Sequence, residues 1–230
     1  MIDLHSHVLP QIDDGSQSPE QMESMLRAAY AQGIRYMVAT PHFYADSMVP
    51  EEFLENRARA AQKLPVSSEG VPQVILGAET AYFDNMSRSE ALQLMRIEGT
   101  NLLLVEMPFR PWTDRVVEDV CMLMDRQGLI PVLAHVERYR KREQFPKYWD
   151  YLLSAGALFQ YNADAFVVSG KRSWAFKQLK KGLVHFLGTD CHNMTTRPPN
   201  MDQAAQMIRK KMGEPTLDEI WEFSSRILHL

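Results

Sequence analysis

Residues 102–135 read LLLVEMPFRPWTDRVVEDVCMLMDRQGLIPVLAH and contain one complete strand, helix and strand pattern. The apolar runs Leu102–Met107 and Ile130–His135 have the length of buried strands, and Asp114–Gln127 between them has a helical pattern. Each apolar run also includes a metal-binding side chain near its end, Glu106 in the first and His135 in the second. The stretch therefore predicts a parallel β/α unit with cation-binding groups at its strand ends.

The same alternation continues along the whole chain. The other strand-like runs bring the total to about seven, and they are Ile2–His5, Tyr36–Thr40, Val74–Ala78, Leu158–Asn162 and Val184–Gly188. Further helix-like stretches lie at Pro19–Gln32, Glu51–Leu64, Arg88–Ile97, Phe145–Ser154, Lys171–Lys180 and Met201–Met212. Repeated β/α units with strands buried on both faces imply a parallel sheet, either closed into a barrel or open and doubly wound.

Length and composition limit the class of protein. The chain has 230 residues, 45% hydrophobic and 23% charged, so we expect one ordered domain spanning residues 1–230. The net charge of -4 and the lack of a long basic block disfavour a nucleic-acid partner, and nothing in the sequence sets an oligomeric state. No signal peptide and no apolar run of roughly 20 residues occur, so a cytoplasmic protein that is not membrane-inserted is expected. Cys121 and Cys191 are expected to be free thiols.

Histidines cluster at the ends of the predicted strands. Of the seven histidines, those at or just beyond strand ends are His5, His7, His42, His135 and His192. His5 and His7 are two residues apart on an extended segment, so both side chains point to the same side and can bind one metal ion. His185 lies inside a strand-like run and is expected to be a core histidine, while His229 near the end of the sequence is expected to have no role in the site.

Carboxylates occupy equivalent places at Asp14, Glu79, Glu106 and Asp190. The neighbouring Asp13 is expected only to cap the backbone of the Asp-Asp-Gly turn. Carboxylates gathered in this way repel each other unless cations neutralise them. Mixed imidazole and carboxylate ligands suit manganese, iron or zinc, of which manganese is favoured. Three divalent ions would outweigh the four carboxylates, attract a phosphate dianion and activate water, which points to hydrolysis of a phosphoester.

Several motifs match one known family. They are Asp3-Leu4-His5-Ser6-His7, Thr40-Pro41-His42, Gly77-Ala78-Glu79, Glu106-Met107-Pro108, Ala134-His135 and Thr189-Asp190-Cys191-His192. In this order, they resemble the motifs of the PHP (polymerase and histidinol phosphatase) superfamily, and they span nearly the whole chain. The continuation His7-Val8-Leu9-Pro10, then Ile12-Asp13-Asp14-Gly15, and the segment His135-Val136-Glu137-Arg138-Tyr139 are more specifically similar to bacterial protein-tyrosine phosphatases of capsule and exopolysaccharide operons.

The resemblance implies a distorted seven-stranded β/α barrel that holds three divalent metal ions. Its ligands would be His5, His7, Asp14, His42, Glu79, Glu106, His135, Asp190 and His192. By the same analogy Glu79 would bridge two ions, and Arg138 and Arg197 would hold the phosphate. The substrate would be a phosphotyrosine protein, namely a bacterial tyrosine autokinase that controls capsular or exopolysaccharide biosynthesis.

Other functions remain open at the level of sequence. Cys191 and Arg197 fit the Cys-x5-Arg pattern of cysteine-based tyrosine phosphatases, although Met194 and Pro198 are poorly suited to a phosphate-cradling loop. A metal-dependent enzyme acting on a small phosphomonoester such as histidinol phosphate, or on nucleic acid as an exonuclease, would use the same ligands. A non-catalytic binding module is disfavoured because such modules normally lose ligands, and here every family position is filled.

Overall fold

The computed structural model describes residues 1–67, 69–140 and 145–230. Its strands are β1 (Ile2–Ser6), β2 (Tyr36–Ala39), β3 (His42–Phe43), β4 (Gln73–Leu76), β5 (Glu79–Ala81), β6 (Leu102–Glu106), β7 (Ile130–Leu133), β8 (Leu158–Asn162) and β9 (Phe186–Gly188). Every strand pair is parallel. One sheet has the order β1-β2-β4, and a curled six-stranded sheet has the order β3-β5-β6-β7-β8-β9. The predicted α/β alternation with a parallel sheet is therefore confirmed.

Backbone hydrogen bonds connect the two sheets on both sides. The Gly77 amide donates to Ala39 O at 2.9 Å, and the Glu79 amide donates to Pro41 O at 3.0 Å, so the pairing continues from β2 and β4 into β3 and β5. On the other side, the Asp190 amide donates to His5 O at 2.7 Å. The sequence predicted about seven strands, whereas nine strand segments form in the described residues. The two additional segments, β3 and β5, begin after a gap of two residues from β2 and β4 and lie beyond the ends of the expected strands Tyr36–Thr40 and Val74–Ala78.

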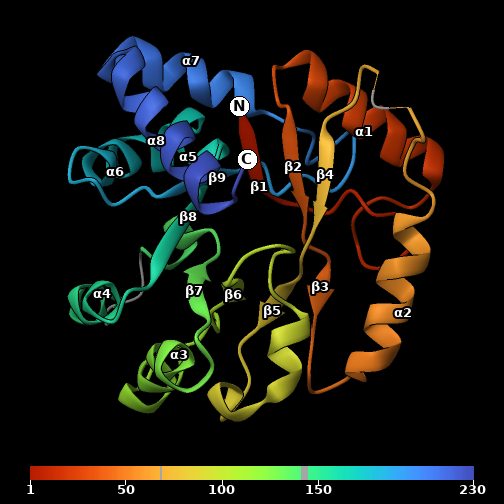
Figure 1. Ribbon diagram of the computed structural model, residues 1–230. Helices are drawn as coiled ribbons and strands as arrows, with labels where there is room; N and C mark the ends of the chain where they lie inside the picture. The colour runs from red at the N-terminus through yellow and green to blue at the C-terminus, as the bar shows by residue number, and fades with distance from the viewer. Residues whose placement is uncertain (68, 141–144) are drawn as a thin grey trace.

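Most of the helices surround the strands on their outer side (Figure 1). They are α1 (Pro19–Ala31), α2 (Pro50–Ala61), α3 (Asp114–Gln127), α4 (Phe145–Ser154), α5 (Asp164–Val167), α6 (Ser169–Leu179), α7 (Met201–Met212) and α8 (Glu214–Ile227). Short 3-10 helices occur at η1 (Met86–Arg88), η2 (Glu90–Leu94) and η3 (Val136–Tyr139). The Thr113 hydroxyl caps the start of α3, and Gly128 ends it in the left-handed conformation with φ of 66°. Within the described ranges, no helix is both long and apolar enough to cross a bilayer.

The helices differ from expectation at one predicted segment and at α5 and α8, which were not among the expected helices. The predicted helix Arg88–Ile97 is wrong, because this segment contains parts of η1 and η2 separated by the extended Ser89. Contacts with α3 explain the break: the Ser87 hydroxyl donates to Asp119 at 2.6 Å, and Gln127 donates to the Ser87 carbonyl at 2.8 Å. Helix α8 was not predicted, although Pro215 in its first turn is a helix-start signal.

The two faces of the curled sheet pack against different partners. A larger cluster joins alternate strand residues such as Leu103 and Val105 to the helices. A smaller cluster on the opposite face includes Leu102, Leu104 and Phe186, and side chains of α8 such as Phe223 pack against it. This smaller core occupies the end where most strands begin, so the carboxyl ends of the strands lie above it.

Candidate metal centre

Polar side chains continue the rows of apolar residues on the inner face of the sheet. In β6, Leu102 and Leu104 belong to the inner core, and Glu106 follows at the same two-residue spacing. After β9, Asp190 follows Phe186 with the same parity. Because side chains two residues apart share a face, the strand ends deliver these acids to one place above the core.

The structure brings all of the sequence-predicted ligands into one connected cluster. Three overlapping groups have ligand atoms within 4.8 Å of one another, and they are His7, Asp14, His42 and His192; His5, His7 and Asp190; and His42, Glu79 and Glu106. His135 joins them through its Nε2 atom, which lies 2.8 Å from Glu79 Oε1 and 3.3 Å from Glu106 Oε1. Most of these side chains are buried, whereas the Asp14 side chain is 64% exposed. The cluster therefore opens to solvent near Asp14.

The centre of the cluster favours a bound cation. His5 Nδ1 lies 3.1 Å from Gln160 Oε1, and His7 Nδ1 lies 2.7 Å from Asp13 Oδ2. Both oxygens are acceptors, so each Nδ1 carries a proton and each Nε2 of a neutral ring has a lone pair. These two Nε2 atoms are only 3.1 Å apart, and Glu79 Oε2 lies 3.2 Å from one and 3.3 Å from the other. Converging lone pairs repel unless a proton or a metal ion lies among them.

Other ring nitrogens also lack a hydrogen-bond partner. Among the described residues, no hydrogen-bond partner is found for the buried atoms His42 Nδ1, His135 Nδ1 and His192 Nε2. His42 Nδ1 is 3.0 Å from Glu79 Oε2, but the angle does not suit a hydrogen bond. His192 Nε2 also faces a carboxylate, at 3.4 Å from Asp14 Oδ1. Buried polar atoms are normally paired, so the unpaired nitrogens of His42 and His192 beside carboxylates are donors expected of a divalent metal site.

The pKa shifts follow from the same geometry. Burial lowers the pKa of His135, but hydrogen bonds to Glu106 and Glu79 outweigh it and raise this pKa to about 9. Burial likewise opposes a charge on His7, yet the hydrogen bonds that it donates to Asp13, Asp190 and Glu79 raise its pKa well above the usual value. Carboxylates that favour a proton on these rings equally favour a metal cation in its place.

Two side chains that hold the histidines were not predicted to do so. Asp13 accepts from the Gly15 amide at 2.9 Å, as expected of a turn cap, but its other oxygen fixes His7 and accepts from the His42 amide at 3.0 Å. Gln160 accepts from His5 Nδ1 and, at 2.7 Å, from the His135 amide. A polar residue within the buried strand β8 is the only sequence signal for Gln160. Such partners set the tautomer and the orientation of a metal-binding imidazole.

The two predicted phosphate-binding arginines meet at one carboxylate. Arg138 pairs with Asp190 Oδ2, and Arg197 Nη2 lies 2.7 Å from Asp190 Oδ1. Their side chains remain 31% and 37% exposed. Burial opposes the charge on Asp190, but His5, His7 and Arg138 outweigh it and hold the pKa of this carboxyl well below its usual range. The arginines therefore lie at the edge of the cluster, anchored on one side and open to solvent on the other.

The same loop argues against a cysteine nucleophile. Cys191 is fully buried, and burial raises the pKa of its thiol, which disfavours the reactive thiolate. The loop amides of Thr195, Thr196 and Arg197 donate to the Asn193 side chain at 3.0, 2.8 and 3.1 Å. They are therefore already paired, and a phosphate cradle made of free amides does not form here. Cys191 and Cys121 are both free thiols, as predicted.

Two curated proteins resemble this chain over most of its length. The tyrosine-protein phosphatase YwqE of Bacillus subtilis is 31% identical over 218 residues, which cover 93% of this chain and 85% of YwqE. The tyrosine-protein phosphatase CpsB of Streptococcus pneumoniae is 30% identical, with 96% of this chain and 95% of CpsB covered.

The fold and the family agree with these relatives. A structure from work on YwqE of Bacillus subtilis and CpsB of Streptococcus pneumoniae, described there as unique metal-dependent tyrosine phosphatases, matches with a TM-score of 0.86 and 26% identity. The match covers 100% of this chain and 94% of that one. The family model for capsular polysaccharide synthesis, CpsB/CapC, matches residues 1–228. The resemblance drawn from the motifs is thus confirmed, and the chain belongs to the CpsB/CapC family of capsular polysaccharide synthesis.

Proposed function

We propose that this chain is a metal-dependent tyrosine phosphatase that acts in capsular or exopolysaccharide synthesis. One observation carries the metal-dependent chemistry: the Nε2 atoms of His5 and His7 face each other at 3.1 Å beside Glu79. Relatives that share the family are named tyrosine-protein phosphatases, which supports phosphotyrosine as the substrate class.

The residues present fit a centre of several divalent cations. The proposed ligands are His5, His7, Asp14, His42, Glu79, Glu106, His135, Asp190 and His192. Three overlapping ligand groups support three ions, and the mixture of imidazole and carboxylate donors favours manganese, with iron and zinc as alternatives. Such ions supply Lewis acidity toward phosphoryl oxygens and lower the pKa of water.

The chain's own residues would bind and orient the phosphate. Arg138 and Arg197 each offer a partly exposed guanidinium beside Asp190, and we propose that both donate hydrogen bonds to phosphoryl oxygens. Asp190 positions them, and Asn162 in turn donates to Asp190 Oδ2 at 2.7 Å. The leaving phenolate of tyrosine has a pKa of about 10, so its departure needs less proton transfer from the protein than an alkoxide would.

We further propose that the strands close into one seven-stranded barrel within a single domain, residues 1–230. The hydrogen bonds from β1 to the Asp190 segment, and from β2 and β4 into β3 and β5, support closure. The mouth of this barrel would be the metal centre. For the natural substrate we propose a bacterial tyrosine autokinase of polysaccharide synthesis, which implies that the phosphatase acts in the cytoplasm.

The proposal is tested with purified protein that is stripped of metal and then supplied with manganese. Hydrolysis of a phosphotyrosine peptide should depend on the metal, exceed hydrolysis of a phosphoserine peptide, and be lost in His42→Ala. The exposed His229 lies outside the cluster, so His229→Ala is the matched control and should keep full activity. Activity that survives chelation would contradict metal chemistry, and a preference for histidinol phosphate would favour a small-molecule phosphatase instead.

A further inference from the structure

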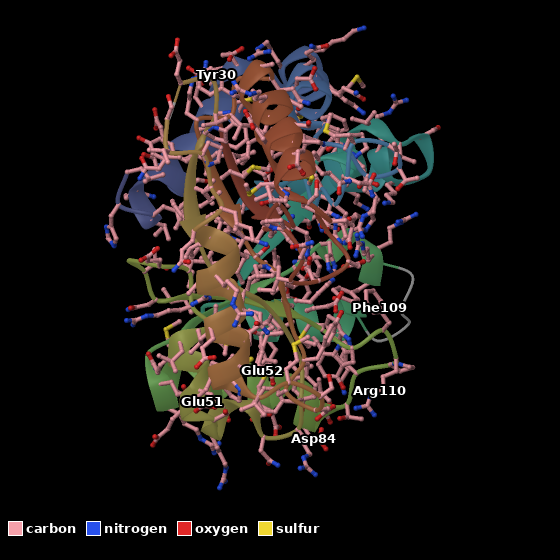
Figure 2. The ribbon with its side chains drawn as sticks, turned by 90° about the vertical axis from the view of Figure 1, so that its right-hand side faces the viewer. Tyr30, Glu51, Glu52, Asp84, Phe109 and Arg110 are labelled. Carbon is pink, nitrogen blue, oxygen red and sulfur yellow. The ribbon has the colours of Figure 1, made fainter. Side chains whose placement is uncertain are left out.

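Two aromatic side chains stand exposed beside the metal centre. Tyr44 is 38% exposed and Phe109 is 47% exposed, although both are large rings. Each stacks on a histidine of the cluster. The Tyr44 ring lies 5.2 Å from the His42 ring at 25°, and the Phe109 ring lies 6.1 Å from the His135 ring at 18°. Figure 2 shows Phe109 on the loop after β6, next to Arg110 at the edge of the molecule.

The sheet order places the two rings on either side of the cluster's central carboxylate. Tyr44 directly follows β3, Phe109 lies three residues after β6, and β5, which begins at Glu79, lies between these strands. Both rings therefore follow the carboxyl ends of strands that flank Glu79. Each ring stacks on the imidazole of a proposed metal ligand, the partly buried His42 for Tyr44 and the buried His135 for Phe109.

Both rings are held in place although their outer faces are open. Phe109 also packs on Tyr139, with ring centroids 5.5 Å apart. The Tyr44 carbonyl accepts from the Ser47 and Met48 amides at 3.0 and 2.9 Å, which fixes the turn that carries this ring. Exposed apolar rings beside a polar site are costly in water and are stabilised when an apolar ligand covers them.

We propose that Tyr44 and Phe109 are specificity-determining residues that contact the phenyl ring of phosphotyrosine. This inference rests on the proposed phosphatase function and names how the same site selects its substrate. With the phosphate at the metal centre and the two arginines, an aryl ester extends its ring outward past these side chains. The single methylene of phosphoserine offers no ring to contact them, so Tyr44 and Phe109 favour phosphotyrosine.

The test replaces each ring by a branched apolar side chain, in Tyr44→Leu, in Phe109→Leu and in the double variant. The measured quantity is the ratio of kcat/KM for phenyl phosphate over kcat/KM for an alkyl phosphate, with manganese present. Each single variant should lower this ratio roughly three- to tenfold, mainly through KM, since aromatic pairs contribute about 0.5–1.5 kcal/mol. Tyr151 on α4 is 50% exposed and outside the cluster, so Tyr151→Leu is the matched control and should leave the ratio as it is.

A binding measurement separates this inference from the proposed function. Calorimetric titration of the metal-supplied protein with phenylphosphonate and with methylphosphonate needs no turnover. If the wild type binds the aryl compound more tightly and the variants lose that preference, the contact of Tyr44 and Phe109 with an aryl ring is supported even if the protein hydrolyses no phosphotyrosine. Equal affinities in the wild type, or an unchanged aryl preference in the double variant, would overturn them.

Discussion

His185 and His5 differ in what their ring nitrogens face. His185 Nδ1 accepts a hydrogen bond from the Phe159 amide at 3.0 Å, and its ring packs between Phe159 and Phe223. A donor on the backbone satisfies its lone pair, so no cation is needed there. The Nε2 atom of His5 faces another lone pair instead. Chemically identical side chains thus serve the core in one place and the proposed metal site in the other.

The environment of His185 makes part of the stability depend on pH. Burial lowers the pKa of His185 to about 4, whereas an unfolded chain has a histidine pKa near 6.5. Between these values the unfolded chain binds a proton here and the folded chain does not. The stability contributed by the neutral ring is therefore complete above about pH 6.5 and is lost as the pH falls toward 4.

We expect the free energy of unfolding to fall by roughly 1–2 kcal/mol more in the wild type than in His185→Asn between pH 7.5 and pH 5.0. Asparagine can accept from the Phe159 amide but does not titrate, so the difference isolates this one group. Urea denaturation in the presence of chelator measures it, because the proposed metal ligands then titrate in the same way in both proteins. Equal pH dependence in the two proteins would contradict the assignment.

Much of the site could be predicted from the residue types at the strand ends. The contacts between residues on different strands could not be predicted. His5, His7 and Glu79 are chemically suited to metals and follow recognisable motifs. Gln160 holds His5 from 155 residues away, and an amide in a strand carries no sign of that partner. Tyr44 and Phe109 likewise read as ordinary loop aromatics, because only the fold reveals which histidine each one covers.

At the scale of elements, the contact between β1 and β9 depends on one glycine. A Cβ atom at Gly188 would lie 2.6 Å from His5 Cβ and 2.7 Å from Gln160 Nε2. Any side chain here must push β9 away from β1 and displace both residues that set the centre of the cluster. Glycine is therefore required by close approach at this position, not by its backbone angles.

We expect Gly188→Ala to lower the free energy of unfolding by about 1–3 kcal/mol and to weaken metal binding. Gly170 in the first turn of α6 has open space around it, so Gly170→Ala is a matched control and should be neutral or slightly stabilising. Chemical denaturation with and without manganese gives both quantities. A Gly188→Ala protein as stable as the wild type, with the same metal affinity, would show that β1 and β9 can accommodate a Cβ atom here without loss of stability.

The β/α alternation could be predicted because buried parallel strands are short, apolar and separated by helical patterns. The positions at which strands and helices are interrupted could not be predicted. The two residues Gly77 and Ala78 lie between β4 and β5 although the apolar run continues into them, because pairing depends on the neighbouring strand and not on hydrophobicity. The break at Ser89 has the same origin, since Asp119 and Gln127 of α3 hold Ser87 through contacts across the sequence.

For the whole molecule, the proposed metal centre connects the ends of distant strands. Its ligands follow or end β1, β6, β7 and β9, and begin β3 and β5, while the core beneath is apolar. Without cations, buried carboxylates and facing imidazole lone pairs destabilise this end of the fold. Metal binding to the folded chain alone must then raise its stability by mass action, by about 2.7 kcal/mol at a hundredfold excess over Kd.

We therefore expect chelation to lower the Tm by roughly 5–10 °C, because about 2–4 °C corresponds to 1 kcal/mol in a chain of this size. Glu79 contacts four imidazoles of the cluster, so Glu79→Gln should lose most of this metal-dependent shift. Glu118 is exposed on α3, and Glu118→Gln should keep the shift in full. Scanning calorimetry of the three proteins with manganese and with chelator decides the matter. If the wild type has the same Tm with manganese and with chelator, protons on the histidines already neutralise the carboxylates of the cluster, and metal binding does not stabilise the fold.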